Sequence, residues 1–193
     1  MRTAKISRKT KETDINVELN IDGEGKQSIE TNVPFMNHML ELFARHGHFD
    51  LIIQAKGDND IDDHHTIEDL GIVMGQVFKE ALGDKKGINR YGFFLLPMDE
   101  SLALVSLDIS NRPFLSYEVN YGGQLQNFDK ALIKEFLTAF VINAGITLHI
   151  KVLAGDNTHH IIEAVFKGLA KSLRQAVNNN PLEKNIPSTK GIL

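Results

Sequence analysis

Two short segments pair adjacent histidines with a glutamate: HHTIE at residues 64–68 and HHIIE at residues 159–163. Successive helical residues turn by about 100°, so the glutamate lies about 40° from the first histidine and about 60° from the second. Glu68 can therefore share a metal ion with either His64 or His65. The two histidines diverge by about 100°, which is too far to bind one ion comfortably. The pattern predicts two metal ions, or one metal ion and one substrate contact.

The two segments occupy matching points of an internal repeat. GDN at 57–59 and GDN at 155–157 lie 98 positions apart, whereas His64 and His159 lie 95 positions apart. The first copy therefore carries three extra residues between GDN and the histidines. Each half reads as strands, helix, strand, turn, histidine pair and helix, which indicates a duplication. One copy alone would be typical of a solvated helix start, but two matching copies favour a metal site.

Two further histidines are candidates for the same site. His149 alternates with apolar residues on the strand expected before the second segment, and an ordinary strand histidine is the alternative. His38 lies in FMNHML, where a polar position on an amphipathic helix is the alternative. With the two segments, they supply six imidazoles and two carboxylates, or four ligands for each of two ions with positions left open for catalysis. A nitrogen and oxygen set without sulfur suits Mn(II), Fe(II), Co(II) or Zn(II).

Strands and helices that hold these residues are expected in the same order in both halves. Hydrophobic periodicity and turn signals predict strands at 4–10, 15–22, 49–58, 113–120 and 146–156, two more within 91–110 joined by a turn at 97–100, and helices at 35–49, 63–84, 127–145 and 157–177. This order predicts a layered α/β fold in which helices pack between two mixed β-sheets. We expect one domain with duplicated halves at about 1–86 and 87–180, and an irregular tail at 181–193.

Composition narrows the class of protein. The formal net charge of −4 gives no basic surface for nucleic acid as the main partner. The absence of cysteine excludes disulfides and thiolate ligands. The polar start has no apolar segment typical of a signal peptide, and the apolar window 136–150 is interrupted by Asn143 and Gly145. We therefore expect no membrane partner and a cytoplasmic location.

Motifs along essentially the whole chain resemble the imidazoleglycerol-phosphate dehydratase family. They are RKTKET (8–13), NHML (37–40), HGHFDL (46–51), DDHHTIEDLGIVMGQ (62–76), GINRYG (87–92), PMDESLA (97–103), TLHI (147–150), GDNTHHIIEAVFK (155–167) and PSTKG (187–191). The resemblance implies a hydro-lyase of histidine biosynthesis, which converts imidazole glycerol phosphate to imidazole acetol phosphate and water. It also implies a ribosomal protein S5 domain 2-like fold and two Mn(II) ions per active site.

Site residues follow from the resemblance position by position. The implied manganese ligands are His38, His64, His65, Glu68, His149, His159, His160 and Glu163. The implied phosphate contacts are Arg90, Arg112, Lys167, Ser188 and Lys190. Glu12 matches an active-site glutamate, and we expect His46 at the substrate and His48 in a structural role. The resemblance further implies trimers that assemble into a 24-subunit particle, with active sites between subunits and assembly promoted by metal.

Several of these residues have simpler alternatives. Arg90 and Arg112 could be surface ion-pair partners. Lys167 lies four residues after Glu163 and could form a helical ion pair with it. Glu12 could be a carboxylate on a solvated strand face. The tail with Ser188 and Lys190 would ordinarily fray, although such a loop can wrap a docked phosphate.

The chain departs from the family pattern at three positions. Asn37 replaces the usual aspartate before His38, and an amide would be a weaker acceptor if this residue orients the imidazole. Asn111 replaces a glycine in the usual GRP, which puts the local turn in doubt. Pro34 also differs from many members. None of these changes removes an implied ligand.

The implied reaction removes a hydrogen from a carbon that has no adjacent carbonyl. If metal ions stabilise the substrate's imidazole as an imidazolate, electrons can expel the neighbouring hydroxyl and give a diazafulvene intermediate. A carboxylate must then move the protons. Glu12 is the preferred base because it is the active-site carboxylate that is not an implied metal ligand. Glu163 or a metal-bound water is the alternative. The aspartates Asp62, Asp63 and Asp69 are expected to support the helix start or the ligands.

Two other classes of function use the same residues. A dinuclear metallohydrolase would release inorganic phosphate from small esters. A non-enzymatic assembly would use the histidines only to join subunits through metal. Some members of the family are fused to a phosphatase domain, and from the length of 193 residues we expect the dehydratase alone.

Overall fold

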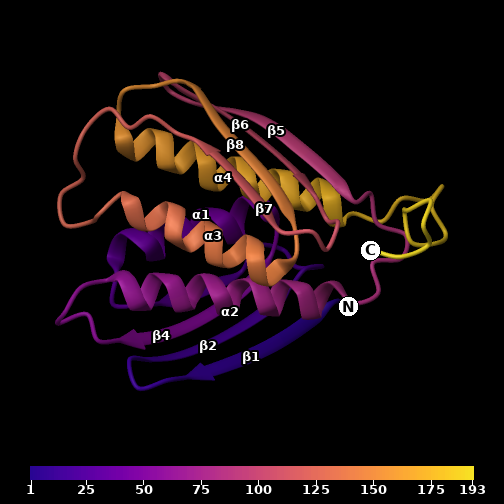
Figure 1. Cartoon of the computed structure of the whole chain (residues 1–193), viewed down its shortest axis with the longest axis horizontal. Helices are drawn as coiled ribbons and strands as arrows, with labels where there is room; N and C mark the ends of the chain where they lie inside the picture. The colour runs from indigo at the N-terminus through magenta and orange to yellow at the C-terminus, as the bar shows by residue number, and fades with distance from the viewer.

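The computed structural model describes residues 1–193 as two four-stranded sheets with four helices between them (Figure 1). The first half contains β1 (Thr3–Lys9), β2 (Thr13–Asn20), β3 (Gln27–Glu30), α1 (Pro34–Gly47), β4 (Asp50–Gly57) and α2 (His64–Leu82). The second half contains β5 (Tyr91–Met98), β6 (Ser101–Asp108), β7 (Phe114–Glu118), α3 (Ala131–Ala144), β8 (Thr147–Ala154) and α4 (Thr158–Val177). The predicted layered α/β fold with two half-domains is confirmed.

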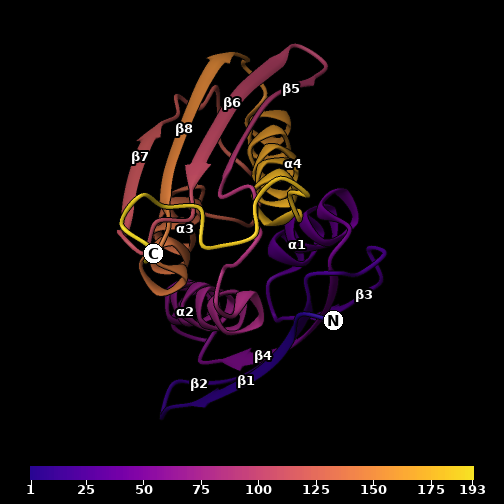
Figure 2. The same cartoon turned by 90° about the vertical axis from the view of Figure 1, so that its right-hand side faces the viewer.

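The two sheets have the same topology. Their strand orders are β1-β2-β4-β3 and β5-β6-β8-β7, and in each sheet the last strand runs parallel to its neighbour while the other pairs are antiparallel. Both sheets are therefore mixed. Helices α1 and α2 pack on the first sheet, and α3 and α4 pack on the second (Figure 2). The histidine pairs open α2 and α4, so both motifs begin at corresponding ends of equivalent helices.

Alternating side chains explain how each sheet joins the core. Along β2 and β6 every second residue is buried, as expected for strands with one face toward the helices. Helix α2 approaches α3 closely at Gly71, where an added Cβ would lie 2.5 Å from the carbonyl oxygen of Phe136. The helices and both sheets share one hydrophobic core, with Phe78, Phe140 and Phe166 at its centre.

Two sequence predictions differ from the structure in detail. Strand β3 was not predicted, because QSIE is short, largely exposed and contains one aliphatic residue, Ile29. Pro97 was placed in a turn, but it lies within β5 and the turn falls at Asp99 and Glu100. Proline fits there because β5 is an edge strand, where a missing backbone donor costs little. None of the helices is long and apolar enough to span a membrane.

Candidate metal centre

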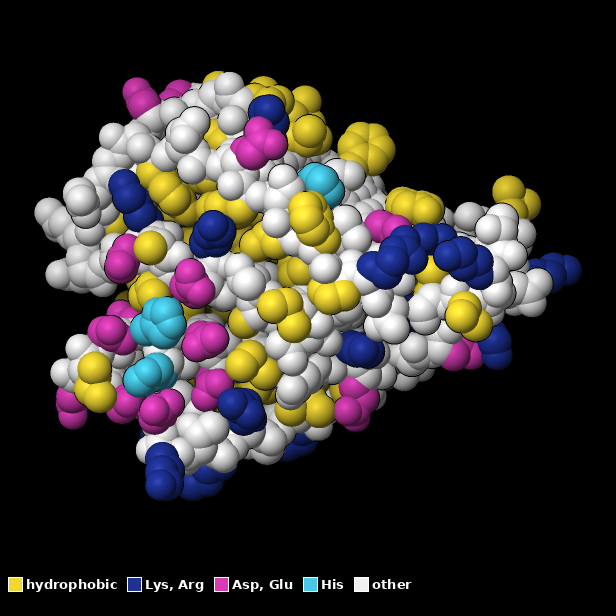
Figure 3. Space-filling model, viewed as in Figure 1, with side chains coloured by type: hydrophobic (Ala, Val, Ile, Leu, Met, Phe, Trp, Pro, Cys, Tyr) yellow, Lys and Arg dark blue, Asp and Glu magenta, His cyan; other side chains and the backbone are white.

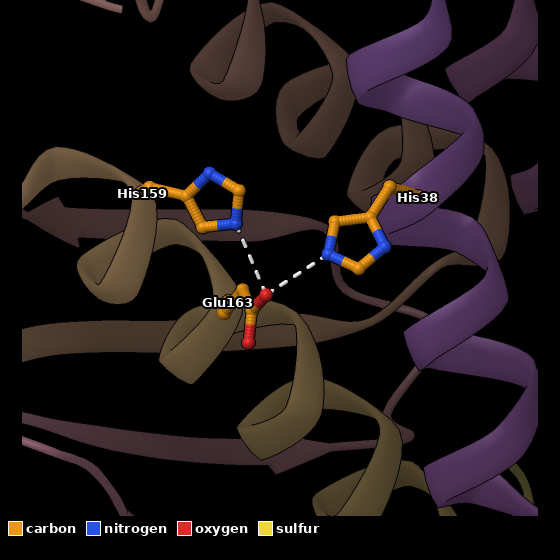
Figure 4. Close-up of side chains that lie close together, drawn as sticks. All are labelled: His38, His159 and Glu163. Carbon is orange, nitrogen blue, oxygen red and sulfur yellow. Dashed lines mark hydrogen bonds and ion pairs between the residues drawn. The ribbon is translucent and has the colours of Figure 1, made fainter.

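Helices α1 and α4 bring together three side chains of the types that bind metal ions. Glu163 Oε1 lies 2.9 Å from His38 Nε2 and 3.1 Å from His159 Nε2, and one ligand atom from each residue lies within 4.8 Å of the others (Figure 4). Ligand atoms about 2.1 Å from a metal at 90° to one another would be about 3.0 Å apart, close to the two hydrogen-bond distances. The donor set of two imidazoles and one carboxylate therefore fits a divalent ion such as manganese.

Local interactions fix where these two helices begin. The side chain of Asn157 caps α4 by accepting hydrogen bonds from the backbone N–H groups of His159 and His160. In the first turn of α1, the Asn37 side chain accepts a hydrogen bond from the backbone N–H of Thr31, ahead of the helix, at 3.0 Å and donates to the Thr31 carbonyl at 3.3 Å. Asn37 therefore fixes the start of α1 and does not contact the His38 ring.

Glu163 is ionised by its surroundings. Its side chain is 9% exposed, and its Oε2 accepts a hydrogen bond from Lys167 Nζ. Burial alone would raise the pKa of Glu163, but hydrogen bonds from Lys167, His38 and His159 outweigh it and hold the pKa at about 2. Lys167 thus forms the helical ion pair that was the alternative to a phosphate contact.

The two motifs differ in the exposure of their glutamates, 49% for Glu68 and 9% for Glu163, whereas His64 and His159 are similarly exposed. His64 Nε2 lies 3.7 Å from Glu68 Oε2, and the two side chains are 43% and 49% exposed. Of the two histidines, His64 is thus the one that pairs with Glu68. No third ligand from this chain completes the group. Carboxylates surround histidine side chains where the helices begin (Figure 3).

The second histidine of each pair contacts a different carboxylate through Nδ1. His65 Nδ1 lies 3.0 Å from Asp58 Oδ2, and His160 Nδ1 lies 2.7 Å from Glu100 Oε2. The hydrogen bond from His160 is the largest cause that lowers the pKa of Glu100 to about 2. Sequence reasoning missed both carboxylates. Asp58 had a local signal in the acidic turn before His65, but Glu100 is 60 residues from its partner and had none.

Glu12 lies beside the first pair, in the turn between β1 and β2. Its Oε2 is 4.0 Å from His65 Nδ1, and its side chain is 55% exposed and accepts no hydrogen bond. Buried Asp69 on α2 accepts hydrogen bonds from Thr13 Oγ1 at 2.5 Å and from Arg8 Nε at 3.1 Å, and so joins the β1–β2 hairpin to this helix. Asp69 therefore holds the hairpin that carries Glu12 against the helix that carries His65.

His149 lies apart from both groups. It is exposed on the outer face of the second sheet, where its ring centroid is 5.6 Å from that of Phe114. His46 lies in the last turn of α1, where burial and then the nearby Lys167 lower its pKa. His48 adopts a left-handed conformation and ends α1, in line with the structural role expected for it.

Apart from Lys167, the expected phosphate contacts lie in a second region around Asp108 and the C-terminal tail. Arg90 Nε donates to Asp108 Oδ1 at 2.7 Å, and Arg112 lies 3.5 Å from Asp108 Oδ2. Arg90 also donates to the carbonyl of Pro187 at 2.9 Å, so the tail docks beside it. Ser188 lines the same surface hollow as Arg90, and Lys190 is exposed nearby in the tail.

Asn111, which replaces the usual glycine, has a φ of 56°. Asparagine tolerates the left-handed region better than most residues, so the turn before Arg112 forms without glycine. The substitution therefore leaves Arg112 beside Asp108.

Comparisons with known proteins agree along the chain. The family model described as imidazoleglycerol-phosphate dehydratase matches residues 31–173. A relative of that name from Bacillus pumilus is 57% identical over 194 residues, covering 100% of both chains. The crystal structure of imidazoleglycerol-phosphate dehydratase from Staphylococcus aureus aligns with a TM-score of 0.84 and 42% identity over 92% of this chain and 99% of the other. A structure from Pyrococcus furiosus aligns with a TM-score of 0.86 and 41% identity over 97% and 100% of the two chains.

Proposed function

The chain belongs to the imidazoleglycerol-phosphate dehydratase family of hydro-lyases, and we propose that it dehydrates imidazole glycerol phosphate to imidazole acetol phosphate in histidine biosynthesis. The observation that carries this proposal is the convergence of His38, His159 and Glu163 in a chain that matches the family over its full length. A site with several nitrogen and oxygen donors suits a metal-dependent dehydration of an imidazole substrate.

We propose that two Mn(II) ions bind per active site. The ligands would be His38, His64, His65, Glu68, His149, His159, His160 and Glu163. When bound, the ions supply Lewis acidity that stabilises negative charge on the imidazole of the substrate. The substrate would then react through the imidazolate and diazafulvene forms that the family resemblance implies.

The phosphate of the substrate is assigned to Arg90, Arg112, Lys167, Ser188 and Lys190, of which Lys167 lies at the opposite end of β5 from Arg90 and would contact it from another subunit. Guanidinium groups bind phosphate oxygens in a bidentate manner. Asp108 holds Arg90 and Arg112 close together, but it binds Arg90 through both Nε and Nη2. A phosphate would therefore bind mainly through Arg112, which is 66% exposed, or displace Asp108 from Arg90. The docked tail brings Ser188 into the same hollow.

Glu12 is the preferred base for the carbon-bound proton. Its carboxylate accepts no hydrogen bond, so both oxygens are available. Glu163 is a poorer base, because three donors hold its pKa at about 2. His46, on the last turn of α1, is assigned to the substrate rather than to proton transfer.

Self-association would complete the site. His149 is exposed on a sheet face away from the other ligands, so the proposed set needs an imidazole from another subunit. The outer face of the second sheet also exposes Phe93, Leu95 and Leu153 to 65%, 49% and 50%. By contrast, the outer face of the first sheet is covered by the ion pairs Lys5–Glu18 and Lys9–Asp14. An apolar face of this kind supports self-association. We propose the trimers and the 24-subunit particle on the family resemblance.

One assay series tests the proposed function. Protein treated with a chelator is assayed with imidazole glycerol phosphate before and after addition of Mn(II), and inorganic phosphate is measured in parallel. We expect dehydration to vanish with the metal and return with it, without phosphate release. Full activity after exhaustive chelation would contradict the metal assignment, and phosphate release would favour the metallohydrolase alternative.

Sedimentation of the same samples tests the assembly. We expect large particles with Mn(II) and smaller species without it. Metal-dependent assembly with no dehydration would instead support a structural role for the histidines. The expected cytoplasmic location stays a prediction.

A further inference from the structure

The second histidine of each pair is bound by a carboxylate through Nδ1, although the two hydrogen-bonding carboxylates come from different turns. Asp58 precedes α2 in the turn after β4 and approaches His65 Nδ1 with both oxygens, at 3.1 Å and 3.0 Å. Glu100 comes from the turn between β5 and β6 and approaches His160 Nδ1 with Oε2 at 2.7 Å. The first histidines differ, because His64 and His159 face Glu68 and Glu163 through Nε2.

The repeat itself shows that these contacts were not inherited as one feature. The residue that matches Asp58 in the second GDN is Asp156, whose side chain makes no hydrogen bond or ion pair. Asp58 lies seven residues before His65, whereas Asp156 lies only four before His160, because the second copy lacks the three extra residues. In the second half, Glu100 supplies the carboxylate instead. Glu100 itself matches Glu12, since each directly precedes the second strand of its sheet, and Glu12 Oε2 lies 4.0 Å from His65 Nδ1. Both halves therefore place a carboxylate at the same ring nitrogen, which indicates a shared requirement.

The hydrogen bond to a carboxylate determines which ring nitrogen of the histidine carries the proton. An ionised carboxylate only accepts hydrogen bonds, so the Nδ1 atom that faces it must carry the proton. In a neutral imidazole the other nitrogen, Nε2, then has a free lone pair, which is the form that binds a metal. The contact also fixes the rotation of the ring.

We propose that Asp58 and Glu100 are positioning residues that hold His65 and His160 as Nδ1–H tautomers and present their Nε2 atoms to the metal ions. The proposal rests on the proposed metal-dependent function. It adds two residues that contact neither the metal nor the substrate and act only through a ligand.

Glu100 is anchored more firmly than Asp58. Its Oε1 accepts hydrogen bonds from the Ser101 hydroxyl at 2.9 Å and from the Asn157 backbone N–H at 3.1 Å, while Oε2 binds the ring. One carboxylate therefore links the β5–β6 turn, the first residues of α4 and His160. The Asp58 side chain forms hydrogen bonds only with its histidine. The two carboxylates should thus differ in how strongly they support metal binding.

The experiment compares Asp58→Asn and Glu100→Gln with wild type in the full chain. Mn(II) is titrated into chelator-treated protein, and free Mn(II) is followed by its paramagnetic resonance signal. We expect each variant to lose affinity for Mn(II) by about 10- to 100-fold, with the larger loss for Glu100→Gln. The thermal midpoint of the metal-free protein is recorded as well, because a purely structural ion pair would change that midpoint and leave the affinity intact.

Two control variants separate the hydrogen bond from simple charge. Asp99→Asn removes a carboxylate 3.9 Å from His160 Nδ1 that makes no hydrogen bond to the ring, and should weaken binding by no more than about fivefold because its charge acts through water. Asp60→Asn removes an exposed charge next to the Asp58 turn and should leave the affinity unchanged.

The outcomes distinguish this proposal from the proposed function. Wild-type affinity in both Asp58→Asn and Glu100→Gln, or equal losses in the controls, would overturn the positioning role and leave the metal assignment standing. A wild-type protein that binds no Mn(II) would overturn both. Because the two contacts lie in different halves, a folding failure in one variant leaves the other as the test.

Discussion

The two histidine motifs are copies in sequence, but only one is closed within the chain. Helix α1 delivers His38 to the second motif, and Glu163 is 9% exposed there. The equivalent helix α3 places Glu135 at the matching fifth position, and this exposed side chain makes no ion pair with the first motif. His64 and Glu68 therefore remain open. The difference teaches that duplication copied the backbone and the motif, whereas within one chain only the second copy gathers a third metal-binding type of side chain.

The largest effects should come from removing the glutamate of either motif. If both copies hold metal, Glu163→Gln and Glu68→Gln should each lower dehydration by at least about 10³-fold, because metal stabilises the transition state by several kcal/mol. The measurement is steady-state turnover together with the manganese content of the purified variants. Near-normal turnover in Glu68→Gln would show that the open copy is not a metal site.

Glu12→Gln should affect chemistry without affecting metal. We expect kcat to fall by about 10²-fold or more, with the manganese content unchanged, because the variant loses a proton acceptor and keeps every ligand. Glu18→Gln is a suitable control, since Glu18 lies on the same hairpin and pairs only with Lys5. A Glu12→Gln variant with normal kcat would transfer the base role to another group.

The helices and strands were largely predictable from the sequence, because their apolar periodicity reflects the core that they bury. The repeat also brought His159 and Glu163 forward as candidates, whereas His38 needed the family resemblance. Asp58, Glu100 and Asp108 were not found. The hydrogen bonds of these carboxylates depend on how turns and strand ends are placed relative to one another in the folded chain. No local sequence pattern predicts that placement.

In the metal-free protein, removing the buried Glu163 should cost more stability than removing the exposed Glu68. Glu163→Ala leaves the Lys167 ammonium, 14% exposed, without its partner and should cost about 3–5 kcal/mol of unfolding free energy. Glu68→Ala removes an exposed contact and should cost less than about 1 kcal/mol. Urea denaturation of the chelator-treated proteins measures both. Equal costs would contradict the distinction between a closed and an open copy.

The contribution of Glu163 to the free energy of unfolding should depend on pH. The pKa of Glu163 falls from 4.5 to about 2 on folding, so its contribution to stability is present above pH 4.5 and is lost as the pH falls toward 2. By pH 3 the loss should be about 2 kcal/mol relative to neutral pH. The difference in unfolding free energy between wild type and Glu163→Gln should shrink by that amount. A difference that stays constant with pH would show that Glu163 is not held ionised.

The most direct measurement is anomalous diffraction at the manganese edge from crystals of the assembled protein with a substrate analogue. Two peaks are expected for each subunit. One should lie among His38, His159 and Glu163, and the other beside His64 and Glu68, with His149 supplied by another subunit. Absence of manganese at either motif would contradict the two-metal centre.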